Sequence, residues 1–112
     1  MDDSVKSQIK AQYPNLTVVP IVSADDGIEI IVTGADHATW AKYQGMKGDF
    51  ADAGKRSQAD ELLVLNSMVW PDKDKFRQEL EARHLTGFYT VAAREIAKLT
   101  GQRDSVKMGE AL

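Results

Sequence analysis

The sequence predicts an α+β fold: an N-terminal helix, one antiparallel β-hairpin and then a bundle of about four helices. Two stretches rich in β-branched residues flank a tight turn between residues 16 and 33. In the second half, apolar residues recur at three- and four-residue steps. Since two strands alone are marginal in water, helices must cover a face of the hairpin. We expect one domain over residues 1–101 and a flexible tail over 102–112.

The composition excludes several functional classes. The chain has 43% hydrophobic and 28% charged residues, and its net charge of -3 arises from interspersed charges of both signs, so we expect no nucleic-acid partner. The chain has no cysteine, which excludes disulfides and thiolate chemistry. Its acidic start lacks a signal-peptide core, and no apolar run approaches the roughly 20 residues that span a bilayer. We therefore expect a soluble intracellular protein with no membrane partner.

A short amphipathic helix is predicted over residues 3–13, where Pro14 stops it. The strands are expected over Leu16–Ser23 and Ile28–Thr33, because Asp26-Gly27 between them supplies the positive φ angles of a tight hairpin. Pro20 removes one ladder donor, which predicts that the first strand lies at an edge. In the second strand, alternation predicts one face with Ile28, Ile30 and Val32 and another with Glu29 and Ile31.

A helix is predicted after the hairpin, over His37–Gly45, with Asp36 as its N-cap. Trp40 and Tyr43 are spaced so that both are expected to face the hairpin. The close pair of glycines at 45 and 48 predicts a loop there.

The densest apolar run leads to Pro71, which is predicted to end one helix just before another begins. The first of these helices is expected from about Ser57 to Trp70, capped by Ser57 or Asp60. Its predicted apolar face consists of Leu62, Leu65, Met68 and Val69. Asp72 is expected to cap the second helix, over residues 72–83, which Phe76 and Leu80 attach to the core.

A final helix is predicted over Phe88–Thr100, capped by Thr86 and followed by a left-handed Gly101. Its expected apolar stripe consists of Phe88, Val91, Ala92, Ile96 and Leu99. Tyr89 is adjacent to Phe88 and is expected to be exposed.

The polar residues form no convergent catalytic or metal pattern. His37 and His84 are far apart in sequence, so we interpret the first as a surface residue and the second as complementing a helix end. Asp25-Asp26-Gly27 lacks the alternating ligands of a calcium loop, and the serines at 57 and 67 lack the surroundings of a nucleophile elbow. We therefore predict no catalytic residue, no cofactor and no metal ion.

The apolar surface near Pro71 is the candidate partner-binding region. Tryptophan often anchors interfaces, and Trp70 at a helix end is expected to be partly exposed. The helix after it has only a thin apolar seam, which leaves room for a groove that receives another helix. The predicted partner-binding residues are Trp70, Met68, Phe76, Leu80 and Tyr89.

The segment Ile30–Gly101 resembles small tail assembly chaperones of long-tailed bacteriophages. The resemblance rests on Ile31–Trp40, on the pattern V-x-P-D-x-x-x-F-x-x-L at Val69–Leu80, and on the helix end Ile96–Gly101. The chain departs from the family at residues 84–87, where relatives often have a proline. The resemblance implies a non-catalytic protein of the host cytoplasm. It would coat apolar helices of the tape-measure protein and help to recruit tail-tube proteins.

Two other functional classes remain open, as does a homo-oligomer. The chain can be a structural virion component of a head, connector or tail. It can also be a small regulator or enzyme, which the lack of a convergent polar cluster disfavours.

Overall fold

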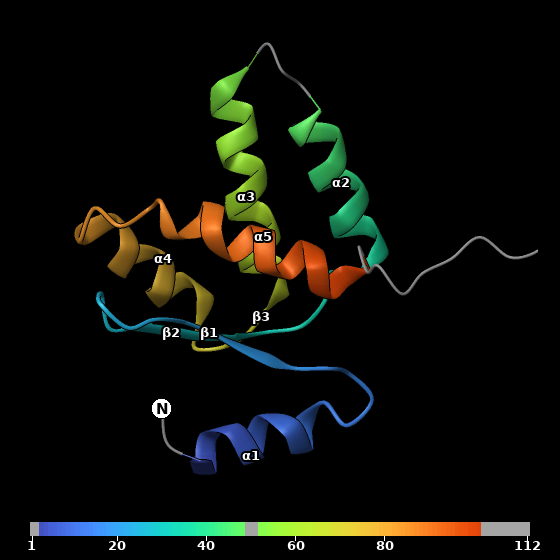
Figure 1. Ribbon diagram of the computed structural model, residues 1–112, viewed down its shortest axis with the longest axis vertical. Coiled ribbons are helices and arrows are strands. Elements are labelled where there is room, and N and C mark those ends of the chain that lie inside the picture. Colours follow the sequence, from blue (N-terminus) through green and yellow to red (C-terminus); the bar gives the residue numbers. More distant parts are fainter. Residues whose placement is uncertain (1–2, 49–51, 102–112) are drawn as a thin grey trace, which may run out of the picture.

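The computed structural model describes residues 3–48 and 52–101 and has an α+β fold, as predicted (Figure 1). In chain order the elements are α1 (Asp3–Gln12), β1 (Val19–Ser23), β2 (Ile28–Val32), α2 (His37–Lys47), α3 (Ala53–Ser67), β3 (Met68–Trp70), α4 (Lys73–Ala82) and α5 (Phe88–Thr100). The third strand was not predicted. The expected tail at 102–112 lies outside the described residues.

The hairpin forms as the sequence predicts. β1 and β2 are antiparallel with Ser23 opposite Ile28, and Gly27 at the turn has φ of 65°. The sheet order is β1-β2-β3, which places β1 and its Pro20 at an edge. β1 is shorter than expected, because the residues before Val19 lie outside the ladder.

The prediction that a helix continues to Trp70 is wrong. α3 ends at Ser67, and Met68–Trp70 pairs antiparallel with β2, with Ile31 opposite Trp70. A residue before proline is forced into extended geometry, and β2 offers a free edge that extended backbone can join. Met68 and Val69 are therefore strand residues.

α3 also starts earlier and is rotated relative to the prediction. Asp52 caps it by accepting from the Lys55 N–H at 3.0 Å, so neither Ser57 nor Asp60 is the cap. The buried face consists of Ala59, Asp60, Leu63, Val64 and Ser67.

α2 begins at the predicted cap, where Asp36 accepts from the Thr39 N–H at 2.8 Å. The helix continues through Gly45 to Lys47, which corrects the predicted loop, because one glycine lowers helix stability without breaking the helix. It packs on α3 rather than on the hairpin: the Tyr43 hydroxyl donates to Asp60 at 3.4 Å. Lys47 pairs with the same buried carboxylate at 2.9 Å.

α4 confirms the predicted role of Asp72, which accepts from the N–H groups of Asp74 and Lys75. The helix ends in a Schellman arrangement: the Leu85 N–H donates to the Leu80 carbonyl at 2.9 Å, and His84 has φ of 56°. His84 is exposed at the end of α4. It is the residue of the turn that adopts the left-handed backbone conformation.

α5 has the predicted bounds but a different buried face. Its buried residues are Tyr89, Ala92, Ala93 and Ile96, whereas Val91 is 55% exposed. The expectation that Tyr89 is exposed is wrong. Thr86 is not the N-cap, since that position belongs to Gly87 without a side-chain hydrogen bond. Gly101 has the predicted positive φ, at 143°.

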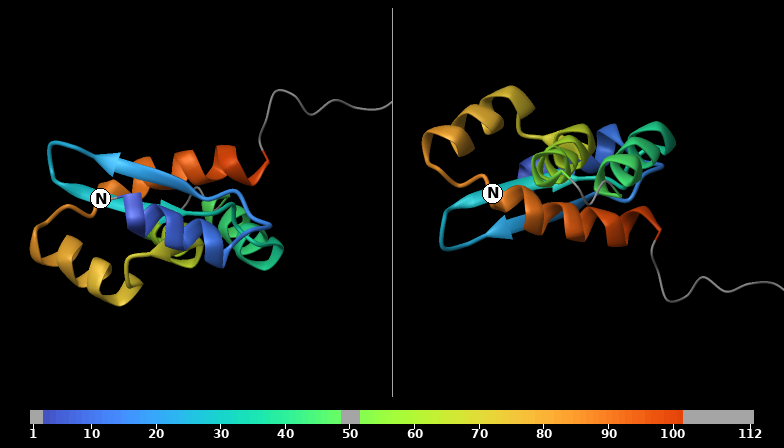
Figure 2. Two further views of the ribbon diagram at one scale, coloured as in Figure 1. Left: turned by 90° about the horizontal axis from the view of Figure 1, so that it is seen from below. Right: turned by 90° about the horizontal axis from the view of Figure 1, so that it is seen from above.

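Apolar side chains pack on both faces of the sheet. On one face, Ile28, Ile30 and Val32 join the main core with α3, α4 and α5. On the other face, Ile31 is 3% exposed and lies under α1, whose Ile9 is 6% exposed; neither residue belongs to the main cluster. Figure 2 shows α1 across the sheet from below, and α2 and α3 on the opposite side from above.

Candidate partner-binding groove

Three of the five predicted partner-binding residues lie in the core. Phe76, Leu80 and Tyr89 are 4%, 0% and 5% exposed. The Phe76 ring makes edge contacts with Phe88 and Tyr89, with centroids 5.8 and 6.3 Å apart. These side chains join α4 to α5, so they have no surface to offer a partner in this conformation. The apolar seam of α4, Phe76 and Leu80, is therefore buried within the chain's own core.

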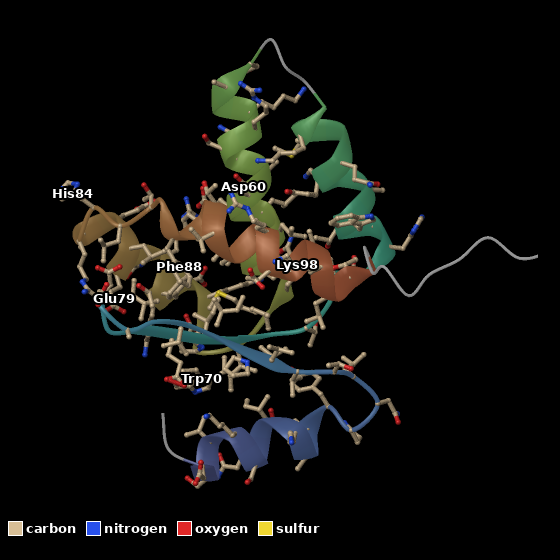
Figure 3. The ribbon with its side chains drawn as sticks, viewed as in Figure 1. Asp60, Trp70, Glu79, His84, Phe88 and Lys98 are labelled. Carbon is tan, nitrogen blue, oxygen red and sulfur yellow. The ribbon has the colours of Figure 1, made fainter. Side chains whose placement is uncertain are left out.

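Met68 and Trp70 are half-buried and belong to opposite faces of β3. Met68 packs against the main core, whereas Trp70, opposite Ile31 in the ladder, lies on the side of α1 (Figure 3). A hollow of about 320 Å³ adjoins Trp70 and Pro71, and Glu29 and Glu79 also line it. The five residues therefore do not form one groove beside Pro71.

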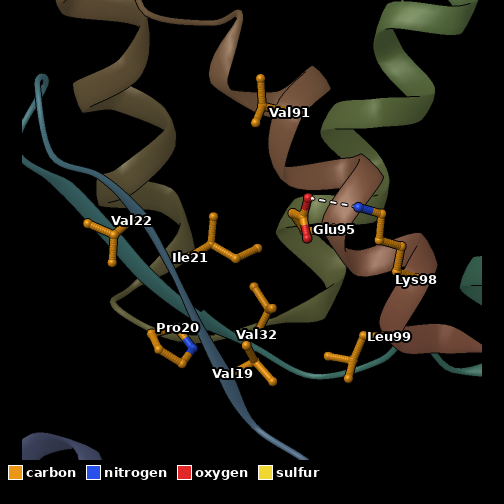
Figure 4. Close-up of a pocket in the computed structure, with 9 residues that line it drawn as sticks. All are labelled: Val19, Pro20, Ile21, Val22, Val32, Val91, Glu95, Lys98 and Leu99. Atoms are coloured by element: carbon orange, nitrogen blue, oxygen red, sulfur yellow. Dashed lines mark hydrogen bonds and ion pairs between the residues drawn. The ribbon is translucent and has the colours of Figure 1, made fainter.

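A larger apolar groove runs between the edge strand β1 and α5 (Figure 4). Its volume is about 590 Å³. Its lining residues are Val19, Pro20, Ile21, Val22, Val32, Val91, Glu95, Lys98 and Leu99. A second hollow of about 440 Å³ shares Ile21, Val22 and Val91 with it and extends toward Phe88 and Leu85. The two together form a continuous depression along β1 and α5, which we call the β1–α5 groove.

Two of the large exposed apolar side chains lie in this groove: Val19 and Val91 are 37% and 55% exposed. Val22 borders the groove and is 58% exposed, but its side chain, opposite Glu29 in the ladder, points away from α5 (Figure 4). Leu16 is the fourth large exposed hydrophobic residue in the described part of the chain. Scattered exposed apolar residues are ordinary, but a contiguous patch marks a binding surface. The sequence did not reveal this site because Val91 fits the apolar spacing of a buried stripe.

α5 is held firmly at both ends and forms a rigid wall of the groove. At its C-terminal end, the Thr100 hydroxyl accepts from the Ala35 N–H at 3.0 Å. Gly34 approaches so closely that a Cβ there would lie 3.4 Å from the Leu99 carbonyl oxygen. At the N-terminal end, Phe88 contacts Phe76. α5 packs mainly on α3, so the side of α5 that faces β1 remains separated from that strand by the groove.

The charged residues of the groove lie at its rim. Lys98 and Glu95 form an ion pair at 3.4 Å, with side chains 65% and 50% exposed (Figure 4). An exposed pair of this kind contributes little stability. The interior of the groove is therefore apolar and its border polar, the usual anatomy of a protein–protein contact.

The shifted pKa values have structural causes. Burial raises the pKa of the Tyr89 hydroxyl to about 12, and burial together with Asp60 raises the pKa of Tyr43. The backbone hydrogen bond from Thr39 lowers the pKa of Asp36 at its cap. These shifts keep each group in its ordinary charge state near neutral pH, so none of them prepares an acid or base for catalysis.

No group of three or more potential metal-ligating side chains occurs within residues 3–48 and 52–101. His37 is exposed at the start of α2, as expected. In the same described ranges, no helix has the length and apolarity needed to cross a membrane.

Comparison with known proteins defines the class of fold. No family model matches the chain, and no curated protein matches its sequence. Among solved structures, the fold is similar to that of a tail assembly chaperone. The matching structure is the tail assembly chaperone of bacteriophage HK97, which has a TM-score of 0.53 and 14% sequence identity, with 89% of this chain and 100% of that chain covered. The fold that the sequence resemblance implied is thereby confirmed.

Proposed function

We propose that this chain is a non-catalytic bacteriophage tail assembly chaperone. It binds apolar helical segments of the tape-measure protein in the host cytoplasm and assists assembly of the tail-tube proteins. The β1–α5 groove, rather than the surface beside Pro71, is the binding site. The observation that carries the proposal is the exposure of Val19 and Val91 on the two walls of one open groove, in a fold similar to that of a tail assembly chaperone.

The geometry favours a helix over an extended strand as the occupant. A strand would have to add to the free edge of β1, but Pro20, the second residue of β1, has no N–H to donate. The groove instead presents apolar side chains from two walls, with charges only at the rim. An amphipathic or apolar helix laid between two such walls buries its side chains without needing backbone hydrogen bonds from the groove.

Co-purification with the tape-measure protein of the same phage tests this proposal. Val91→Asp places a carboxylate in the centre of the groove, where it would be desolvated by an apolar helix. Because Val91 is 55% exposed, the substitution leaves the fold intact, which circular dichroism verifies. We expect a loss of affinity of about tenfold or more, corresponding to about 1.4 kcal/mol.

Thr90→Asp is the matched control, because Thr90 is exposed on the same helix outside the β1–α5 groove. Val19→Asp, on the opposite wall, should reproduce the loss. Equal retention of the tape-measure protein by Val91→Asp and Thr90→Asp would rule out the groove as the binding site.

A further inference from the structure

The sheet face opposite the main core holds a helix that fits it poorly. Among the ten residues of α1, Ile9 is the one that is buried. A gap of about 410 Å³ remains between α1 and the sheet. Its lining residues are Asp3, Lys6, Ser7, Ile9, Lys10, Val18, Pro20 and Ile31. The sheet therefore provides a binding surface for a helix, formed by Val18, Pro20 and Ile31, which we call the seat. α1 lies on this surface without filling the space above it.

The poor fit comes from two lysines. Lys6 and Lys10 are four residues apart and both line the gap, so they share a side of α1 next to Ile9. The opposite wall of the gap is apolar, with Val18, Pro20 and Ile31. A helix with large apolar side chains at these two positions would bury them against this wall, as the lysines cannot without losing the hydration of their charges.

The buried anchor of α1 does not belong to the main core. Ile9 and Ile31 lie outside the main cluster. The link between α1 and β1, residues 13–18, has no buried residue. Six linking residues can span roughly 20 Å when extended, enough to carry α1 away from the sheet.

We propose that α1 is a displaceable cover and that the sheet face beneath it binds an amphipathic helix of a partner protein. That helix carries large apolar residues at i, i+3 and i+4, matching positions 6, 9 and 10 of α1. This site deepens the proposed function, on which it rests, because it gives an apolar client a second contact surface distinct from the β1–α5 groove. Occupation by α1 reduces the fraction of molecules that can bind and so lowers the apparent affinity.

Two variants of the full chain shift the cover in opposite directions. Ile9→Asp removes the apolar anchor and places a carboxylate against Ile31, so α1 leaves the seat. The double variant Lys6→Leu and Lys10→Leu fills the gap and holds α1 in place. The probe is a fluorescein-labelled peptide of residues 1–15 carrying the same two leucine substitutions. We expect it to bind Ile9→Asp about tenfold more tightly than the double variant, with the wild type between them.

Trp70 reports directly on the seat, because it lies on this side of the sheet (Figure 3). The chain has two tryptophans, so Trp40→Phe leaves Trp70 as the sole emitter. In this background Ile9→Asp should shift the emission of Trp70 to longer wavelength, and the bound probe should reverse the shift.

Three results would overturn the proposal. The first is equal affinity of the probe for Ile9→Asp and for the double leucine variant. The second is loss of probe binding in Val91→Asp, which would place the probe in the β1–α5 groove. The third is self-association of the wild type that Ile9→Asp abolishes, with no probe binding by either protein, which would assign the seat to α1 of a second copy. Failure of tape-measure co-purification with unchanged probe binding would instead count against the proposed function alone.

Discussion

The two faces of the sheet differ sharply in how they are covered. On one face, Ile30 lies at 0% exposure in a cluster that spans β1, β2 and α2–α5. On the other, Ile31 lies at 3% exposure under a single helix that buries one residue of its own. Nearly equal exposure therefore conceals unequal packing, because one residue is enclosed by several tied elements and the other by one loosely held element.

The face covered by α2–α5, which we call the thick face, holds α5 in place and with it one wall of the β1–α5 groove. The face covered by α1, which we call the thin face, contributes less to the free energy of folding, so it can be exposed at a lower free-energy cost. Local stability is expected to be uneven in this way wherever an element makes few buried apolar contacts.

Ile30→Ala tests the thick face and should have the largest effect. Deletion of this fully buried side chain removes contacts in a core that cannot collapse around the space. We expect a loss of about 4 kcal/mol in the free energy of unfolding, measured by urea denaturation. A loss no larger than that of the neighbouring variant, Ile31→Ala, would show that the two faces are equally packed.

Ile31→Ala is the matched substitution on the thin face, with the same residue type and strand position shifted by one. Because α1 can move toward the sheet and fill part of the space, we expect a smaller loss of about 2 kcal/mol. The change in strand propensity is the same for both variants, so the difference between them isolates packing. Amide hydrogen exchange of α1 should also accelerate in Ile31→Ala, whereas exchange in α5 should not.

The sequence predicted the features that depend on local chemistry. Asp36 and Asp72 cap helices because a carboxylate two or three residues before free N–H groups satisfies them wherever the chain goes. The hairpin follows from Asp26-Gly27, and the edge position of β1 follows from Pro20. These features need no knowledge of distant neighbours.

The features that depend on distant neighbours were missed. Met68–Trp70 becomes a strand because β2 has an open edge, which periodicity within the segment cannot indicate. α5 turns Ala92 and Ala93 inward because small side chains let it approach α3, so the more hydrophobic Val91 is left outside. The β1–α5 groove joins residues far apart in sequence and was unpredictable for the same reason.

Tyr89→Phe sharpens the comparison from within the thick face and should have the smallest effect. The Tyr89 hydroxyl is buried and has no hydrogen-bond partner among the described residues. Removing an unsatisfied buried group should raise the free energy of unfolding by about 1 kcal/mol at pH 8. Thermal unfolding of both proteins at the same pH measures this gain.

The same variant has a distinct dependence on pH. Burial raises the pKa of Tyr89 from 10.0 to about 12, so its contribution to stability is complete below pH 10 and is lost as the pH rises toward 12. The wild type should therefore lose about 1 kcal/mol more than Tyr89→Phe between pH 8 and pH 11. Tyr13 and Tyr43 are present in both proteins and cancel in this comparison. Parallel pH profiles for the two proteins would mean that Tyr89 reaches water, and that the thick face is less closed than its packing implies.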